Sequence, residues 1–393
     1  MTDAREAYQA ALAYFQGGQL GEAENICRRI LEADPGHAES LHLLGLVAHQ
    51  VGQRESAVQL IKQAIAIRGD RATFHCNLGA IYHSMGELGD AEQALRRALA
   101  IDPNLADAHF NLGNVLRSSQ QILPAIAAYQ RTIQLKPDFA EPYSHLGALL
   151  QVQGDLPAAI WNFEQALRRL GGHALIHFHL ATIYETQQQL GPAVASYREA
   201  VQLDPNLVPA LARLGALVLS QGELTEAVAC FEQAVRLLPD NADLRFNLGC
   251  AYHAQKQHAS AIDCYQQALR LNPGFVPVYF NLGSALKAEG RLSEALSNFE
   301  AAAALQPDSS AAHFNLGTML LEFGQPDAAA TALREAVRLG PAHVEAMMTL
   351  GELLQAQARP DEALELYHQV IQRKPEFAPA YVARGTLYRA GAH

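Results

Sequence analysis

The sequence has one tryptophan and five cysteines among 393 residues, and charged residues make up only 18% of it. The odd number of cysteines and the absence of a Cys-x-x-Cys pair favour reduced, buried thiols over a disulfide framework. No apolar run approaches the roughly 18 residues that a membrane-spanning helix needs. Apolar residues nevertheless reach 49%, so the chain can form a core along its whole length.

Basic residues are also too few and too dispersed to suit nucleic acid. The net charge is -11, and no cluster of lysine and arginine is long enough to follow a phosphate backbone. Residues 1–16 carry early acidic residues and lack the basic segment and unbroken apolar run of a secretory signal. We therefore expect a soluble, cytoplasmic protein with no membrane span and no nucleic-acid partner.

Motifs for catalysis and metal binding are missing as well. The sequence contains no P-loop and no dinucleotide-binding glycine fingerprint. His173, His177 and His179 lie close together, but on a helix His177 and His179 would point to nearly opposite sides. At most two of the three could share a metal ion, with no third ligand. We expect no cofactor, no metal and no catalytic domain in this chain.

The dominant feature that is present is a 34-residue repeat. Leu-Gly pairs recur at this spacing or its multiple, and they begin at Leu44, Leu78, Leu112, Leu146, Leu214, Leu248, Leu282, Leu316 and Leu350. Twelve residues after each glycine position stands an alanine: Ala23, Ala57, Ala91, Ala125, Ala159, Ala193, Ala227, Ala261, Ala295, Ala329 and Ala363. A large residue follows four positions later in all repeats except the first, and a proline comes eight positions after that in nine of eleven repeats.

These residue types predict a pair of antiparallel helices in each repeat. Small residues at fixed places let two helices approach closely, and the large residue fills the remaining space. A second glycine, present in seven repeats, suits a left-handed residue at the end of the first helix. Proline ends the second helix. Such a unit cannot bury its apolar face alone and must stack on its neighbours.

The pattern resembles the tetratricopeptide repeat family. The resemblance implies an all-α, right-handed superhelical solenoid whose first helices line a groove that binds a peptide or protein. We expect a single domain, 1–393, with eleven full repeats at 4–37, 38–71, 72–105, 106–139, 140–173, 174–207, 208–241, 242–275, 276–309, 310–343 and 344–377. A terminal helix is expected at 378–393.

Polar residues precede the Leu-Gly position in eight consecutive repeats. They are Asn77, Asn111, His145, His179, Arg213, Asn247, Asn281 and Asn315. Each lies about 100° round its helix from the core leucine, so we expect it to face the groove, with Asn114 nearby. An asparagine amide offers a donor and an acceptor that match the backbone of an extended peptide. We predict that these nine residues form the peptide-binding site.

Motifs such as Phe110-Asn111-Leu112-Gly113-Asn114 resemble the asparagine ladder in the repeat arm of O-linked N-acetylglucosamine transferases. That resemblance implies a clamp on peptide backbone, although His145, His179 and Arg213 interrupt it. Asparagine is also frequent at this position in tetratricopeptide repeats generally, which is the alternative explanation. No lysine stands where repeats that clamp the carboxylate of heat-shock chaperones need one, so that function is not expected.

Two functions therefore remain open. The chain is either a free-standing scaffold that binds a protein or peptide, or the non-catalytic substrate-recruiting arm of a larger glycosyltransferase. Self-association into a homo-oligomer through an open apolar end is compatible with both.

The junction of the fifth and sixth repeats has Gly171-Gly172 in place of the usual proline, and Ala181 in place of the Leu-Gly glycine. We expect limited proteolysis to cut first at Gly171-Gly172, because the rigid residue and the close-packing residue are both missing there. Mass spectrometry of the early fragments checks this. First cuts at another inter-repeat turn would contradict it.

Overall fold

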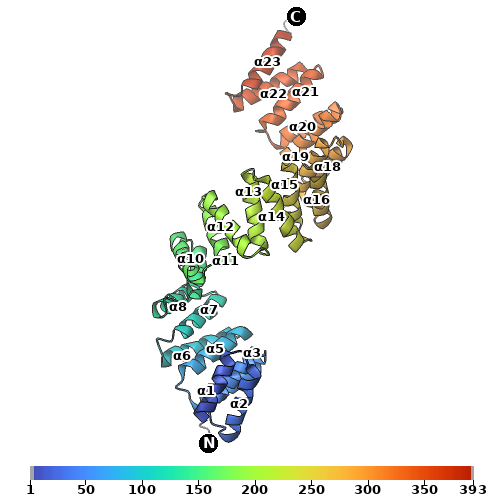
Figure 1. Ribbon diagram of the computed structural model, residues 1–393. Coiled ribbons are helices and arrows are strands. Elements are labelled where there is room, and N and C mark those ends of the chain that lie inside the picture. Colours follow the sequence, from blue (N-terminus) through green and yellow to red (C-terminus); the bar gives the residue numbers. More distant parts are fainter. Residues whose placement is uncertain (1–3, 391–393) are drawn as a thin grey trace. The chain divides into compact units, whose positions relative to one another are not determined.

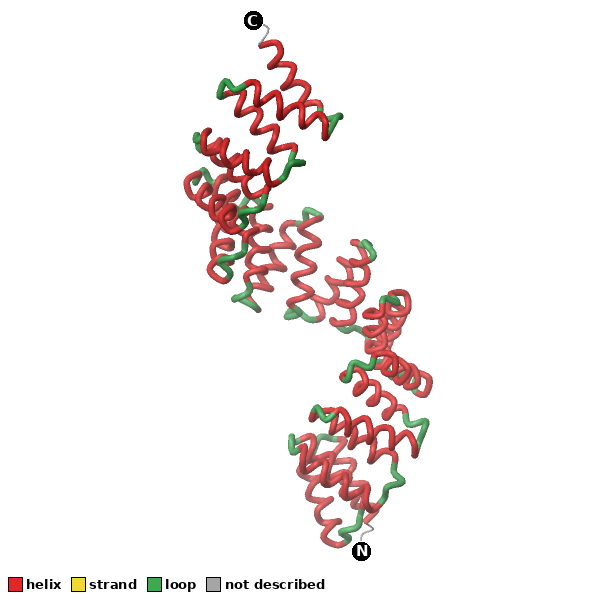
Figure 2. Tube along the Cα trace, turned by 180° about the vertical axis from the view of Figure 1, so that it is seen from behind, coloured by secondary structure: helices red, strands yellow, loops and turns green. Residues whose placement is uncertain are grey.

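The computed structural model describes residues 4–390, and over that stretch the chain consists of 23 α-helices and loops without strands (Figures 1 and 2). The odd-numbered helices are α1 (Ala4–Gln16), α3 (Ala38–Gln50), α5 (Ala72–Met85), α7 (Ala106–Ser118), α9 (Glu141–Gln153), α11 (Ala174–Thr186), α13 (Val208–Ser220), α15 (Ala242–Ala254), α17 (Val276–Ala288), α19 (Ser310–Glu322), α21 (Val344–Ala356) and α23 (Ala378–Ala390). The even-numbered helices are α2 (Leu20–Ala33), α4 (Arg54–Ile67), α6 (Leu88–Ile101), α8 (Ile122–Leu135), α10 (Leu156–Leu170), α12 (Leu190–Leu203), α14 (Leu224–Leu237), α16 (His258–Leu271), α18 (Leu292–Leu305), α20 (Pro326–Leu339) and α22 (Pro360–Arg373). The predicted all-α repeat of two helices is confirmed.

The turn between the two helices of a repeat contains a left-handed residue. The glycines predicted for this role all have positive φ: Gly18, Gly52, Gly86, Gly154, Gly222, Gly290 and Gly324. In the other four repeats Gln120, Gln188, Lys256 and Ala358 adopt the same conformation, with φ near +60°. The left-handed turn is therefore conserved among the repeats even where a non-glycine residue has a Cβ atom that makes this conformation sterically unfavourable.

Nine of the eleven repeats are closed by a contact between the Leu-Gly glycine and the large residue of the even helix, and the first and sixth repeats have Ala11 and Ala181 in place of that glycine. A Cβ atom at Gly249 would lie 2.6 Å from Cε1 of Tyr265, and one at Gly147 would lie 2.9 Å from Cδ1 of Phe163. The large residues at this position include the most deeply buried side chains of the chain, such as Tyr265 at 0% exposure. The eleven alanines of the repeat are likewise 0% exposed. The predicted close approach of the two helices is confirmed.

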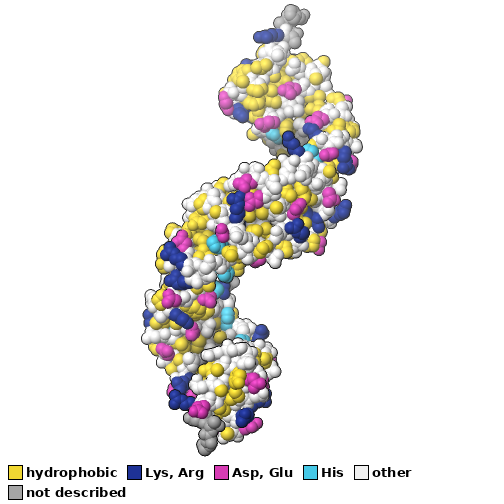
Figure 3. Space-filling view, in the orientation of Figure 1, with side chains coloured by type: hydrophobic (Ala, Val, Ile, Leu, Met, Phe, Trp, Pro, Cys, Tyr) yellow, Lys and Arg dark blue, Asp and Glu magenta, His cyan; other side chains and the backbone are white. Residues whose placement is uncertain are grey.

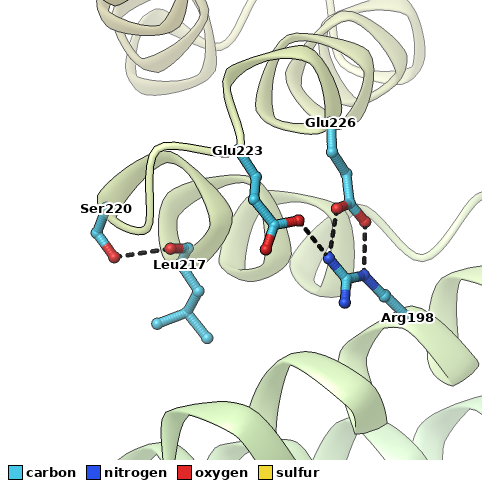
Figure 4. A network of polar contacts seen from close by, with 5 residues as sticks. All are labelled: Arg198, Leu217, Ser220, Glu223 and Glu226. Atoms are coloured by element: carbon cyan, nitrogen blue, oxygen red, sulfur yellow. Dashed lines mark hydrogen bonds and ion pairs between the residues drawn. The ribbon is translucent and has the colours of Figure 1, made fainter.

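Successive even helices are joined by ion pairs at some repeats. Arg198 on α12 donates from Nε to Glu226 Oε1 at 2.9 Å, and from Nη2 to Glu226 Oε2 and Glu223 Oε2, both at 2.6 Å (Figure 4). These hydrogen bonds lower the pKa of Glu226. The equivalent ion pair four repeats later joins Arg334 Nη2 to Glu362 Oε2 at 3.5 Å. Exposed pairs of this kind contribute at most about 1 kcal/mol each, so the apolar contacts dominate the stacking.

The chain divides into two compact units, Met1–Ser196 and Tyr197–His393, and the division falls within α12. In the first unit, one apolar cluster runs from Ala48 to Leu149 and a second from Tyr143 to Ile183. In the second unit, one cluster runs from Ala261 to Leu387. Each cluster draws residues from two or more consecutive repeats, as stacked repeats require.

The loop at Gly171-Gly172 differs from the other inter-repeat loops. Helix α10 has 15 residues, one more than the other even helices, and it ends at Leu170. Gly171 then adopts a left-handed conformation with φ of +80°. The even helices that precede a proline instead end through an extended residue, such as Asp102 before Pro103.

The glycine contact yields a test of the packing. Gly249→Ala should destabilise the chain by about 1–3 kcal/mol, because the added methyl group meets a rigid, fully buried tyrosine ring. Gly89→Ala is the matched control, since nothing lies within 4 Å of a Cβ atom there and alanine favours a helix. Thermal unfolding followed by circular dichroism checks both variants. Equal midpoints for the two variants would contradict the packing described here.

Candidate functional site: a polar row on the odd-numbered helices

Eight of the nine predicted site residues lie at one register position on consecutive odd helices, and Asn114 stands three residues after that position on α7. In the first unit they are Asn77 on α5, Asn111 and Asn114 on α7, His145 on α9 and His179 on α11. In the second unit they are Arg213 on α13, Asn247 on α15, Asn281 on α17 and Asn315 on α19. Arg213 is exposed and the others are half-buried. We call these residues the polar row, and the surface on which they lie within each unit the odd-helix face.

In the first unit the asparagines of the row are hydrogen-bonded to the preceding repeat. Nδ2 of Asn77 lies 2.9 Å from Nε2 of His42, and Nδ2 of Asn111 donates to Sγ of Cys76 at 3.5 Å. Both pairs are 35 residues apart, so each links neighbouring odd helices. These two amides thus join neighbouring repeats and also lie on the odd-helix face. The sequence analysis did not single out His42 and Cys76. Each of them stands directly before the register position of the polar row, and this placement could have identified them.

His145 is held by aromatic rings instead of hydrogen bonds. Its ring stacks on Phe110 and Tyr129, with centroids 5.8 and 5.5 Å away. Burial, helped by the charge of Arg117, lowers the pKa of His145 to about 4, and Glu141 opposes the shift. The imidazole is therefore neutral at physiological pH and presents an aromatic surface.

His179 belongs to a polar network between the fifth and sixth repeats. Its ring lies parallel to that of Phe163, with centroids 5.3 Å apart. Its Nδ1 lies 2.9 Å from Oε1 of Gln151, whose amide donates to Oγ1 of Thr182 at 2.8 Å. Burial lowers the pKa of His179, and because the glutamine oxygen can only accept a hydrogen bond, the neutral ring that makes this contact carries its proton on Nδ1. Gln151 and Thr182 are further members of the site that the sequence did not single out.

Asn114 is engaged within its own repeat, since its Oδ1 accepts a hydrogen bond from the hydroxyl of Tyr129 at 2.8 Å. This contact engages Oδ1 of Asn114 and leaves the two N–H donors of its Nδ2 group available.

Figure 3 shows histidine side chains following one another along the first unit, over the stretch that α5 to α11 occupy in Figure 1. In this unit the odd-helix face therefore combines amides with neutral imidazoles.

In the second unit the amides of the row are less engaged. Asn281 donates to the carbonyl oxygen of Pro277 on its own helix at 3.0 Å. Asn247 and Asn315 make no side-chain hydrogen bond to another residue of the described chain. A half-buried phenylalanine precedes each of the three; Phe246, for example, packs on Tyr265 and Phe275. Three amides with unused donors and acceptors therefore stand on consecutive odd helices.

Charged groups flank the row without a dominant sign. Acidic residues stand in the first turn of several odd helices and basic ones in the last turn, as the helix dipole favours. Several of them are paired, as in Lys287 with Glu322 at 2.5 Å and Lys136 with Asp107 at 3.8 Å.

Within residues 4–390 no three His, Cys, Asp or Glu side chains converge as a metal site would need. Nor does any helix in that range have the length and apolar character to cross a bilayer.

Comparison with known families identifies the repeat. Tetratricopeptide repeat patterns match residues 81–119, 113–154, 146–207, 207–273, 280–344 and 320–385. The chain belongs to the tetratricopeptide repeat family. A further match, over residues 16–98, is to the family of anaphase-promoting complex, cyclosome, subunit 3.

Several solved structures are similar to this chain. MamA is 28% identical, with 41% of this chain and 94% of MamA covered and a TM-score of 0.37. YrrB, described as a TPR protein with an unusual peptide-binding site, is 22% identical over 48% of this chain and 97% of its own, with a TM-score of 0.41. PilF of Pseudomonas aeruginosa is 21% identical over 52% and 93%, with a TM-score of 0.49. No protein of curated function matches, so the resemblance to glycosyltransferase arms rests on the asparagine motifs alone.

The buried histidines predict that stability falls in acid. Burial lowers the pKa of both His42 and His145 to about 4 from an ordinary value of 6.5. Between these values the unfolded chain binds more protons than the folded one, so stability present above pH 6.5 is lost as the pH falls toward 4. The loss should be about 2–3 kcal/mol for each histidine.

Thermal unfolding midpoints of the wild type and of His145→Phe, measured from about pH 7 to about pH 4, check this expectation. The variant should lose less stability on acidification, because it retains the stacking without the titrating group. His173→Phe changes an exposed histidine and should follow the wild type. A His145→Phe curve that also follows the wild type would show that His145 does not contribute.

Proposed function

We propose that this chain is a non-catalytic scaffold that binds an extended polypeptide along the odd-helix face. The observation that carries the proposal is the row of amides on consecutive helices, with unused hydrogen-bonding groups on Asn247 and Asn315 and on Oδ1 of Asn281. Tetratricopeptide repeats extend through the described chain, and this architecture is typical of scaffolds. The odd-helix face is in this view the binding groove.

The spacing of the row suits an extended backbone. Neighbouring packed helices lie about 10 Å apart, and an extended chain advances about 3.3–3.5 Å per residue. One amide of the row therefore meets roughly every third residue of the ligand. An amide can accept from a peptide N–H and donate to a peptide C=O without contacting side chains, so binding tolerates many sequences.

The two units should contribute differently to this binding. In the second unit, amide groups of Asn247, Asn281 and Asn315 need not break an inter-repeat hydrogen bond to bind a ligand. In the first unit, Asn77 and Asn111 each keep one donor in such a bond, and His145 and His179 offer aromatic surface. We therefore assign backbone capture chiefly to the second unit and side-chain contacts to the first.

A second candidate is that the same face serves as the substrate-recruiting arm of a glycosyltransferase. The observation that favours it is the Phe-Asn-Leu-Gly motif, which places a half-buried phenylalanine before the asparagine on α7, α15, α17 and α19. Both candidates use the row in the same way, and they differ in whether the bound polypeptide is presented to a catalytic domain.

The test removes three amides at once. Each hydrogen bond contributes about 0.5–1.5 kcal/mol net, so Asn247→Ala, Asn281→Ala and Asn315→Ala together should weaken binding by about 10- to 1,000-fold. Fluorescence anisotropy with labelled β-casein and with reduced, carboxymethylated α-lactalbumin, two unrelated unfolded chains, measures the change. Because the lost contacts are to backbone, the factor should be similar for both probes.

The matched control carries Gln266→Ala and Asn298→Ala, which remove half-buried amides from the even helices α16 and α18. It should bind both probes as the wild type does. Wild-type affinity of the triple variant for both probes would overturn the proposal, as would binding of neither probe by the wild type.

A further inference from the structure

Position 48 is the exception in a series of bulky residues. Three residues after the Leu-Gly glycine position, the other eleven odd helices have tyrosine, leucine or valine, whereas α3 has Ala48. The bulky residues fill the space between consecutive even helices, and Leu116, Leu286 and Leu354 are at most 2% exposed. At this position α3 therefore lacks the bulky side chain that the other odd helices have.

A crevice of about 510 Å³ lies at this point, between α2, α3 and α4. Apolar side chains of Leu44, Val47 and Leu60 line it together with Ala48, and Val51 at its edge is 51% exposed. The polar rim of the crevice consists of Arg28, the carboxylates of Glu24 and Glu55, a serine and several glutamines. The crevice belongs to the even-helix side and shares no residue with the polar row.

The same register elsewhere explains why this crevice is open. Between the tenth and eleventh repeats, Leu354 occupies the place of Ala48, and the Arg334–Glu362 pair spans the two even helices. The crevice there is about 260 Å³. In the first two repeats Ser56 stands in the register of Glu362, and Arg28 pairs instead with Glu24 on its own helix at 2.6 Å. No ion pair of the Arg334–Glu362 kind spans α2 and α4 at this place.

Other repeats indicate which side chain suits this space. Tyr82, in the register of Ala48, has the ammonium of Lys62 5.5 Å from its ring centroid. Tyr252, also in that register, donates its hydroxyl hydrogen to Glu232 at 2.6 Å. Lys62 and Glu232 both occupy the register of Arg28. A tyrosine entering the crevice would thus place its ring beside a cation, a favourable pairing, and its hydroxyl at a polar rim.

We propose that the crevice at Ala48 receives a tyrosine side chain from a partner polypeptide, which docks on the even-helix side. This is a second interaction surface, independent of the polar row. It differs from the row in recognising one aromatic side chain instead of peptide backbone. The complementarity of the Arg28 cation and an aromatic ring favours tyrosine over an aliphatic side chain.

Methyl NMR of the full chain tests the proposal, with the capped tripeptides acetyl-Gly-Tyr-Gly-amide and acetyl-Gly-Ala-Gly-amide as probes. At millimolar concentrations the tyrosine peptide should shift the methyl signals of Ala48 and Val51 saturably, and the alanine peptide should not. Arg28→Ala should weaken this binding about two- to fivefold, as expected for loss of an exposed cation–π contact. Ala48→Tyr should abolish the Val51 shift and raise the unfolding midpoint.

Leu116→Ala supplies a gain-of-binding control. Its site matches that of Ala48, because Arg96 stands in the register of Arg28 and likewise pairs with Glu92 on its own helix. This variant should unfold at a lower temperature and acquire a second site for the tyrosine peptide. The Asn247, Asn281 and Asn315 triple variant should bind the tripeptide as the wild type does, which separates this site from the polar row.

The proposal is overturned if the tyrosine peptide produces no saturable shift in the wild type, or if it shifts Val51 equally in Ala48→Tyr. Equal shifts from the two peptides would also overturn it, since the crevice would then not recognise the aromatic ring. None of these results bears on binding of unfolded chains at the polar row.

Discussion

The contact between one glycine and one large side chain, present in nine of the eleven repeats, sets the geometry on which the other features depend. Gly249 lies so close to the ring of Tyr265 that even a methyl group would not fit between the two helices. This contact fixes the separation and rotation of the odd and even helices. Because the row residue stands two positions before the glycine, the same contact directs it to the odd-helix face. The packing of the two helices and the placement of the polar row thus have one origin in the repeat.

The hydrogen bonding of the asparagines in the polar row differs between the two units. In the first unit, Asn77 and Asn111 use part of their hydrogen-bonding capacity to join neighbouring repeats. In the second unit, the side chains of Asn247 and Asn315 are unengaged by the described chain and the adjacent phenylalanines provide the packing. The same residue type at the same register position therefore links neighbouring repeats in one unit and keeps unused hydrogen-bonding groups in the other.

The sequence predicted the fold well, because the features that build it recur within a single repeat. The small residues, the buried tyrosines and the odd-helix location of Asn247 all follow from one 34-residue pattern. Contacts that join different repeats were not predictable in this way. The bond from Asn77 to His42 depends on which residue happens to precede the row in the neighbouring repeat. The left-handed turn at Lys256 was likewise hidden, since only the constraint of the flanking helices imposes it on a non-glycine residue.

The division between contacts within a repeat and contacts between repeats has a consequence for how such a chain can change in length. The glycine contact lies within a single repeat, so removing or duplicating a block of 34 residues leaves every such contact complete. What changes is the single new junction, where one residue such as His42 meets a different neighbour. Recombination within the gene can therefore exchange whole segments of the odd-helix face while most of the core remains intact. New side-chain contacts arise at the junctions first, and the fold tolerates them because its stability is distributed among many equivalent contacts.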